Sequence, residues 1–326
     1  FQRTLRSDLL VEVAYVGSRG QRIWVNRARN AVSTDFLPLG AGLDAVVANP
    51  YFGVIPTGEL SAATVRRSQL LRPVTHYTGI SRFRDAVGDS VYHGLTVRVD
   101  KTMGGGLSLH TAYTVSKQID NVQERFGGRS GFINPNDLAR SRSVGEFDRP
   151  QFLRMGYIWE LPFGQGKRWI SGGLPARILG YWQVAGITTF GKGLPLVMTG
   201  PNNTRLPDVG ATAVRLKSPI LPDGQRSIDR WFDTTAFQPA PTYSLGNDSR
   251  TQPNLRGPGQ KTFDIGLSRN QRIRERVRVQ FRGEFFNAFN TPQFSEPNGS
   301  VTATNFGQIT SAGAGRVIQM GIRVSY

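Results

Sequence analysis

The stretch GRVIQMGIRVSY, Gly315 to Tyr326, alternates between two kinds of side chain. Every second position is apolar: Ile318, Met320, Ile322, Val324 and Tyr326. The positions between them are small or polar: Gln319, Gly321, Arg323 and Ser325. Because successive side chains of a strand point to opposite faces, this pattern predicts a β-strand with one apolar and one polar face.

The same period of two recurs along the whole chain. It is found in residues 8–17, 91–101, 107–116, 152–161, 181–190, 263–269 and 276–286. No segment supports a helix longer than a short piece of loop. The sequence therefore predicts an all-β protein.

Short and long connectors alternate between these predicted strands. Short turns are expected at 18–20, 103–106, 163–177 and 270–276, and long loops at 28–89, 117–149, 191–261 and 287–315. Outer-membrane barrels have short turns on the periplasmic side and long loops outside, and a strand of about 9–11 residues spans the bilayer. The pattern favours an antiparallel up-and-down transmembrane β-barrel. A soluble β-sandwich, whose strands also alternate, is the other fold considered.

Aromatic residues support the membrane interpretation. If the short turns share one side, five rings are expected near it: Tyr15, Trp159, Tyr181, Trp182 and Tyr326. Such rings favour the interface between membrane and water. Ile322 and Val324 are then expected to face lipid and Tyr326 to lie at the periplasmic interface, where the barrel closes.

Composition excludes several kinds of chemistry. The chain has 326 residues, a net charge of +17, no cysteine and three histidines without ligand spacing. Disulfides, thiol catalysis and thiolate metal sites are excluded, and we expect no cofactor and no metal. No run approaches the ~20 apolar residues of a spanning helix. The first residues, FQRTLRSDLL, do not resemble a signal peptide, so we expect a fragment of a longer protein.

Three carboxy-terminal segments resemble the end of TonB-dependent receptors: VQFRGEFFNAFNTPQF (279–294), NFGQIT (305–310) and RVIQMGIRVSY (316–326). More narrowly, they resemble the Oar-like group, as do VEVAYVGSRGQRI (11–23), YHGLTVRVDKTMGGGLSLHTAYTVSKQID (92–120), FDRPQFLRMGYIWELPFGQGKRW (147–169) and LGYWQVAGITTFGKGLPLVMTG (179–200). The resemblance implies a barrel of about 22 strands. Residues 1–326 would be its carboxy-terminal part, without the plug, the TonB box and the amino-terminal carboxypeptidase-regulatory-like domain. A terminal aromatic residue also resembles the signal that the barrel-assembly machinery recognises, here Tyr326 with Val324 and Ile322.

The resemblance implies a function without bond chemistry, so we expect no enzyme. The whole receptor would sit in the outer membrane of a Gram-negative-type bacterium, among lipid and lipopolysaccharide. It would bind a large solute, such as an oligosaccharide or a peptide, and admit it when the TonB complex displaces the plug. A structural or adhesive surface barrel without transport is one alternative. A soluble β-rich binding protein is the second alternative.

The basic excess gathers in turns, loops and the expected lumen face, notably at Arg269, Arg272, Arg274, Arg276, Arg278 and Arg282. A polar lumen and charged rims explain it, and attraction of lipopolysaccharide phosphates or of an anionic solute is the functional alternative. No nucleic-acid-binding motif is present. The lumen-facing candidates, which would form ion pairs or contact the plug, are Arg98, Glu160, Arg278, Arg282 and Glu284.

The segment 218–241 has two interpretations. Asp223, Asp229 and Asp233 suggest calcium, but their spacing does not match an EF-hand loop. We expect instead a turn at Asp223 and an aromatic group that packs the loop on itself: Trp231, Phe232 and Phe237. In the resembled family outer loops contact the substrate. The candidates for ligand contact are therefore Trp231, Phe237 and Tyr243.

Overall fold

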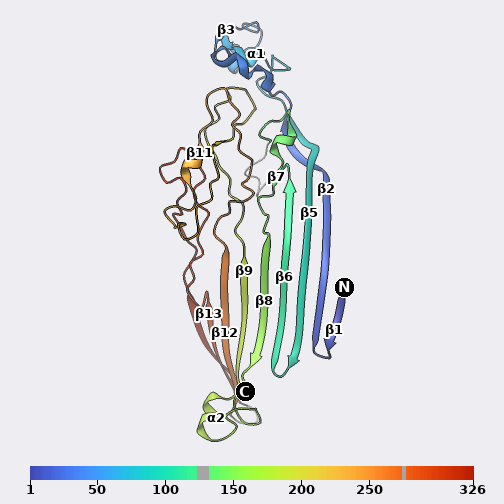
Figure 1. The fold of residues 1–326 in the computed structure, drawn as a ribbon, viewed down its shortest axis with the longest axis vertical. Helices are drawn as coiled ribbons and strands as arrows, with labels where there is room; N and C mark the ends of the chain where they lie inside the picture. Colours follow the sequence, from blue (N-terminus) through green and yellow to red (C-terminus); the bar gives the residue numbers. More distant parts are fainter. Residues whose placement is uncertain (123–131, 274–276) are drawn as a thin grey trace.

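The computed structural model describes residues 1–122, 132–273 and 277–326. They form a ten-stranded antiparallel sheet in which the long strands lie in sequence order (Figure 1). The strands are β1 (Gln2–Arg6), β2 (Leu9–Ala28), β5 (Ser81–Gly104), β6 (Leu107–Asp120), β7 (Ser143–Val144), β8 (Gln151–Glu160), β9 (Trp182–Gly191), β12 (Gln260–Arg272), β13 (Arg278–Phe286) and β14 (Val317–Ser325). Short β7 pairs with the end of β6. Each long strand pairs with the next one along the chain, so the predicted up-and-down arrangement is confirmed.

The register gathers apolar side chains on one face of this wall. Val13 pairs with Val97, which pairs with Tyr113 on the next strand. Tyr113 in turn pairs with Leu153, and Leu153 pairs with Phe190. Because directly paired residues share a face, one apolar row crosses five strands. On β13 and β14 the same face carries Phe281 with Ile322 and Phe285 with Ile318.

The opposite face is polar along the same strands. Glu12 pairs with Arg98, Arg98 with Ala112, and Ala112 with Arg154. Arg154 pairs with Thr189. The alternation predicted from the sequence is therefore carried from strand to strand by the pairing. Both faces of the wall lack a covering layer in this part of the chain, and every residue of β14 is exposed.

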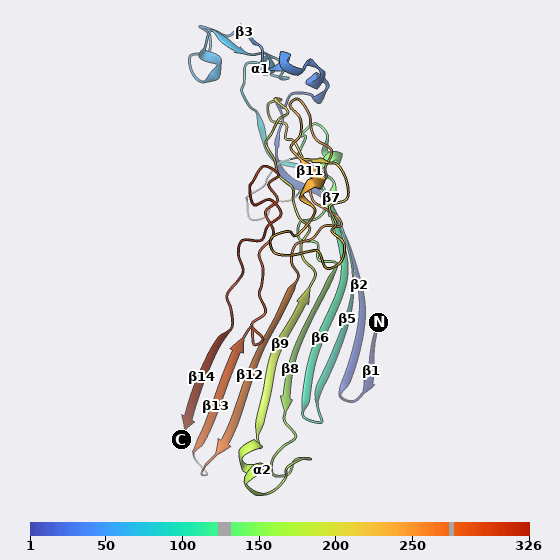
Figure 2. The ribbon, with the colours of Figure 1, turned by 60° about the vertical axis from the view of Figure 1, so that its left-hand side comes forward.

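Connector lengths separate the two ends of the wall. At one end lie four connectors: residues 7–8, the glycine turn 105–106, the segment 161–181, and the β12–β13 turn, of which 274–276 are outside the described residues. At the other end lie four long loops: 29–80, 121–150 (of which 123–131 are outside the described residues), 192–259 and 287–316. Figure 2 shows the four loops gathered above the strands. The predicted alternation of short and long connectors is confirmed.

The turn expected at Ser18–Gly20 is wrong. β2 continues through this segment, where Arg19 pairs with Val91 and Gly20 with Ser90. The irregularity is a bulge at Arg22, since the register shifts between Gln21 and Ile23 and Arg22 has φ of 56°. A bulge inserts an extra residue without reversing the chain. The first short turn instead lies between β1 and β2.

This correction moves one member of the predicted aromatic girdle. Trp159, Tyr181 and Trp182 lie at the short-turn ends of their strands, as expected, and Tyr326 follows the end of β14. Tyr15 does not, because it lies further along β2, about 20 Å from the turn at residues 7–8. Its hydroxyl is 2.6 Å from Nδ1 of His93 on the same apolar face.

Helices are short and lie only in connectors. They are η1 (Thr34–Leu43), η2 (Glu59–Ser61), α1 (Arg67–Leu70), η3 (Leu138–Ser141), α2 (Gly173–Leu179) and η4 (Thr234–Ala236), and the loops add the strand pairs β3 (Val46–Ala48) with β4 (Thr64–Arg66) and β10 (Val214–Arg215) with β11 (Phe237–Gln238). None of the helices in the described ranges has the length and apolar character needed to cross a membrane.

Candidate functional site: the outer loops and the polar face

The four long loops bind one another and form one layer, which we call the loop cap. The amide of Val32 donates to the carbonyl of Pro207, and the amide of Gly210 donates to the carbonyl of Ile133. The fourth loop joins through the amide of Trp231, which donates to a carbonyl oxygen of Gly307 at 2.9 Å. These bonds link loops that are distant in the sequence. The cap is therefore one folded unit and not four independent loops.

An aromatic core supports the loop 192–259. Phe232 is fully buried, and its ring meets those of Phe237 and Phe306 edge to face at 6.0 and 5.2 Å. Trp231 packs against this group, and its indole nitrogen donates to the carbonyl of Arg256 at 2.7 Å. The predicted packing of the loop on itself is confirmed. Since Phe237 is only 6% exposed, it offers little surface here, and ligand contact by Trp231 or Phe237 stays a prediction.

Tyr243 joins two loops. Its ring packs against a second buried cluster that contains Leu43 and Leu206. Its hydroxyl donates to a carboxylate oxygen of Asp44 at 3.0 Å, and this hydrogen bond raises the pKa of Tyr243. A contact between Tyr243 and a ligand likewise stays a prediction.

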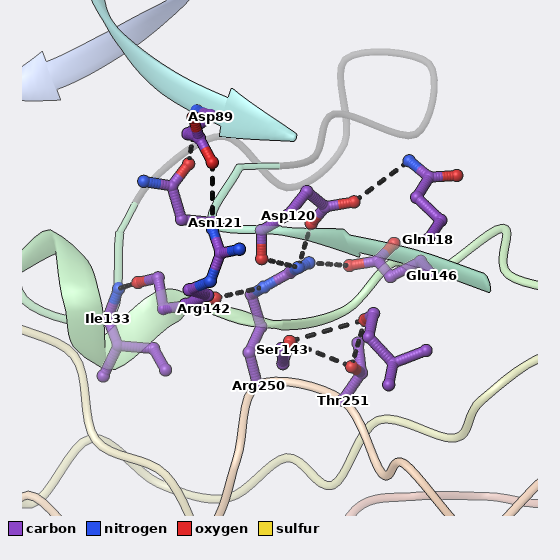
Figure 3. Close-up of polar contacts among 12 residues, drawn as sticks. Asp89, Gln118, Asp120, Asn121, Ile133, Arg142, Ser143, Glu146, Arg250 and Thr251 are labelled. Atoms are coloured by element: carbon purple, nitrogen blue, oxygen red, sulfur yellow. Dashed lines mark hydrogen bonds and ion pairs between the residues drawn. The ribbon is translucent and has the colours of Figure 1, made fainter. Parts of the chain in front are cut away.

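Two arginines of the loop 192–259, Arg250 and Arg256, clamp it to the neighbouring loop and to the end of β6, and Figure 3 shows the contacts of Arg250. The Arg250 guanidinium contacts the carboxylate of Asp120, lies 3.5 Å from Glu146, and donates to the carbonyl of Ser141 at 2.9 Å. The Asp120 side chain is 3% exposed and that of Arg250 is 12% exposed. Arg256 makes a second pair with Asp148 at 2.5 Å. Buried charges of this kind are tolerated only when they are paired.

Smaller polar contacts extend the clamp in Figure 3. The Thr251 hydroxyl contacts the Ser143 hydroxyl at 3.0 Å and also donates to the carbonyl of Val144. Arg142 reaches Asp89 on β5 at 2.9 Å. No local sequence pattern indicates this network, because Arg250 and Asp120 are 130 positions apart.

The aspartates of the segment 218–241 do not converge. The Asp233 carboxylate accepts hydrogen bonds from Lys217 at 2.8 Å and from the Thr235 hydroxyl at 2.8 Å, and these lower the pKa of Asp233 to about 2. Asp223 lies in a turn with Gly224, whose φ is 80°. The described part of the chain holds no group of three or more His, Cys, Asp or Glu side chains placed to bind a metal ion.

A cavity of about 390 Å³ lies inside the loop cap. Three loops line it: Glu146 comes from 121–150, Leu196 and Thr199 come from 192–259, and Glu296 and Asn298 come from 287–316. Glu146 also belongs to the Arg250 clamp. The shape of the cavity therefore depends on the contacts that hold the loops together.

The register places the five predicted lumen-facing residues on the polar face, although whether they line a lumen stays a prediction. Arg98 lies 2.7 Å from Asp100, which also contacts His110 at 2.8 Å. Glu160 is 3.0 Å from Lys167 at the short-turn end. Arg282 contacts Glu284 on β13, and Arg278 begins that strand.

This face carries a hollow of about 430 Å³ across the strands β6, β8, β9, β12 and β13. Small residues form its floor, and an added Cβ at Gly156 would have no heavy atom within 4 Å. His110, Asp264, Arg282 and Glu284 line it together with apolar side chains, among them Ile158, Ile187 and Phe286. The hollow therefore offers both charged groups and apolar surface to a partner against the wall.

The other sequence predictions are placed as follows. Arg274 and Arg276 lie outside the described residues. Arg269 is a correction: it does not join the polar face, because its partners Trp182 and Phe281 lie on the apolar face. Ile322 and Val324 lie on the apolar face, paired with Phe281 and Val279. A role in assembly for them and for Tyr326 stays a prediction.

Comparison with known proteins gives the family. A comparison with curated proteins gave no match. Similar solved structures include the outer membrane transporter YddB from Escherichia coli (8% identity, TM-score 0.47, 99% of this chain and 31% of that chain) and P. aeruginosa FpvA bound to heterologous pyoverdines (9%, 0.36, 97% and 24%). The chain thus spans less than a third of the length of either. The family model described as "Outer membrane beta barrel domain" matches residues 1–319, so the chain belongs to that family and is a protein of the cell outer membrane.

Proposed function

We propose that this chain is part of an energy-coupled outer-membrane transporter that takes up a large solute. The single observation that carries the proposal is the folded loop cap, with its cavity, above a wall that has one apolar face and one face with charged side chains. A barrel used only to anchor a protein needs neither a charged inner hollow nor an interlocked cap. A selective transporter needs both, since it must bind a solute outside and then let it pass a polar lumen.

The solute class follows from the cavity and from the sequence resemblance. A volume of about 390 Å³ is at the lower end for a small-molecule site, so it holds one part of a larger solute. Glutamates and amide groups suit the hydroxyl and amide groups of an oligosaccharide or a peptide. The energy would come from the TonB complex acting on a plug domain supplied elsewhere in the receptor. Tyr326, Val324 and Ile322 would direct the chain to the barrel-assembly machinery.

Uptake by living cells tests this proposal. Cells with and without the whole receptor are incubated with two probes, a maltodextrin ladder and a tryptic peptide mixture, and depletion of each species is followed by mass spectrometry. We expect a subset of one mixture to be depleted only when both the receptor and TonB are present. Depletion without TonB would indicate a passive pore. No receptor-dependent depletion, together with receptor-dependent adhesion to surfaces, would contradict transport and support the adhesive alternative.

The wall and the cap can be tested separately in the same assay. Replacement of Gly266, which lies on the polar hollow, by Phe should reduce uptake without changing assembly, because the added ring fills the hollow. The matched control is Gly321→Phe, because Gly321 lies on β14, on the same polar face of the sheet, but outside the hollow. If Gly266→Phe takes up as much solute as Gly321→Phe, the hollow is not on the transport path.

A further inference from the structure

The connector 161–181 differs from the other connectors at the short-turn end, because it is long and contains α2. Leu174 and Ile178 are 70% and 62% exposed. They are four positions apart, so they lie on the same side of the helix. The same connector holds four more exposed apolar residues: Trp169, Ile170, Leu179 and Tyr181. None of these six side chains is buried by the residues that the structure describes.

Contacts with the wall show on which side of the sheet α2 lies. Arg269 is on the apolar face of β12, in register with Trp182 and Phe281. Its guanidinium donates to the carbonyl of Arg177 and, at 3.2 Å, to that of Ile178. The indole nitrogen of Trp182 also donates to the carbonyl of Ile178, at 3.1 Å. The carboxy-terminal end of α2 is therefore bound to the lipid-facing side of the wall.

The connector is held firmly in this position. An added Cβ at Gly180 would lie 2.4 Å from the carbonyl oxygen of Ala176 and 2.9 Å from Cα of Gly164. This close backbone approach requires glycine. The amide of Trp169 also donates to the carbonyl of Pro162 at 2.9 Å. The exposed apolar side chains are thus displayed by a defined structure.

The charges of the connector all have one sign. Residues 161–181 contain Lys167, Arg168 and Arg177 and no Asp or Glu. Lys167 is engaged by Glu160, 3.0 Å away, whereas Arg168 and Arg177 are exposed and directly precede the apolar residues Trp169 and Ile178. Cations beside an apolar helix face are typical of segments that lie in the headgroup layer of an anionic membrane.

We propose that the connector 161–181 is a membrane-interface anchor that binds anionic phospholipid of the periplasmic leaflet. Its short-turn end faces the periplasm, as in other barrels of the outer membrane. Leu174 and Ile178 enter the acyl region, continuous with the apolar face of the wall, and Arg168 and Arg177 contact lipid phosphates. The proposal rests on the membrane location of the chain and not on transport.

The absence of cysteine allows a direct test by single-cysteine labelling. An environment-sensitive fluorophore is placed at Leu174→Cys or Ile178→Cys in the full chain, reconstituted in vesicles of phosphatidylcholine and phosphatidylglycerol. We expect strong quenching by spin-labelled acyl chains and several-fold protection from aqueous iodide. Met320→Cys on β14 is the lipid-facing reference. Leu216→Cys, which is 57% exposed in the loop cap, is the water-facing reference. If labels at 174 and 178 behave like the label at 216, the anchor is refuted.

The lipid class is tested in the same system. Quenching at Ile178→Cys should increase when phosphatidylglycerol is added to phosphatidylcholine vesicles. The added substitutions Arg168→Gln and Arg177→Gln should abolish this increase, and Arg168→Lys with Arg177→Lys should restore it. The backbone carbonyl that Arg269 binds is unchanged in these variants, so the helix stays docked. An equal response in both vesicle types by the parent would refute recognition of anionic lipid.

Discussion

Replacement of Arg250 by Met should open the loop cap. The substitution keeps most of the side-chain volume but leaves Asp120, which is 3% exposed, without its arginine partner. Removing one partner of a buried ion pair costs about 3–5 kcal/mol, because an uncompensated charge remains buried. Since each 1.4 kcal/mol is about a tenfold change, the population of the opened loop should rise by roughly 10²- to 4 × 10³-fold.

Hydrogen exchange of the Gln252 amide measures this population. Gln252 is 1% exposed, and its amide donates to the carbonyl of Leu196 at 2.8 Å, so exchange requires the loop to open. The matched control is Arg230→Met, because Arg230 is 53% exposed and pairs with Asp233 at 3.5 Å. A surface pair contributes about 0–1 kcal/mol, so exchange in the control should change by less than about fivefold.

A second substitution separates charge from packing. Arg250→Met combined with Asp120→Asn should recover a large part of the lost protection, since the more deeply buried of the two carboxylate charges beside Arg250 is then removed as well. Unchanged exchange in Arg250→Met, or an effect no larger than that of Arg230→Met, would refute the role of the clamp. A double variant that exchanges faster than the single variant would show that packing, not charge, dominates.

Three further predictions concern the loop cap. The hydrogen-bonded carboxyl of Asp233 should titrate in an NMR experiment with a midpoint near its pKa of about 2, and a midpoint near 3.8 would contradict the hydrogen bonds. The ionised carboxylate should stabilise the folded loop by roughly 1–2 kcal/mol, fully above about pH 4, and this contribution should be lost as the pH falls through 2. Gly246→Ala should destabilise the loop by more than about 2 kcal/mol in proteolysis assays, because φ is 70° and the new Cβ would lie 2.1 Å from a carbonyl oxygen. The control Gly224→Ala, where φ is 80° but the space is open, should cost only about 1 kcal/mol, and equal effects would contradict the close backbone contact at Gly246. Phe232→Ala should lower the stability of the loop by about 3–5 kcal/mol in the same assay, since the ring is fully buried. A loss under about 1 kcal/mol would show that the aromatic group does not stabilise the loop.

The wall was predictable because each strand carries its own signal. Alternation in the segment around Val97 or Ile322 identifies a strand and its apolar face without any knowledge of its neighbours. Pairing was predictable too, since short turns force consecutive strands together. The turn predicted at Ser18–Gly20 was wrong because a serine and a glycine around an arginine resemble a turn sequence. Only the pairing with β5 shows that the strand continues through this segment.

The site was less predictable because it depends on contacts between distant residues. Arg250 lies on the loop 192–259 and Asp120 ends strand β6, and neither has a local pattern that points to the other. β1 was missed because a five-residue strand with two arginines has almost no apolar signal. The position of Arg269 on the apolar face follows from the alternation of β12. Its hydrogen bond to a carbonyl of α2 could not be predicted, because α2 lies far from it in the sequence.

The central claim is that the apolar face of each strand contacts lipid and the polar face contacts water. The most direct test is the difference in the free energy of unfolding from bilayers between Met320→Arg and Gln319→Arg, which are adjacent residues of β14 on opposite faces. We expect Met320→Arg to cost about 2–4 kcal/mol and Gln319→Arg to cost less than about 0.5 kcal/mol. Equal costs at the two positions, or a larger cost at Gln319, would contradict the account.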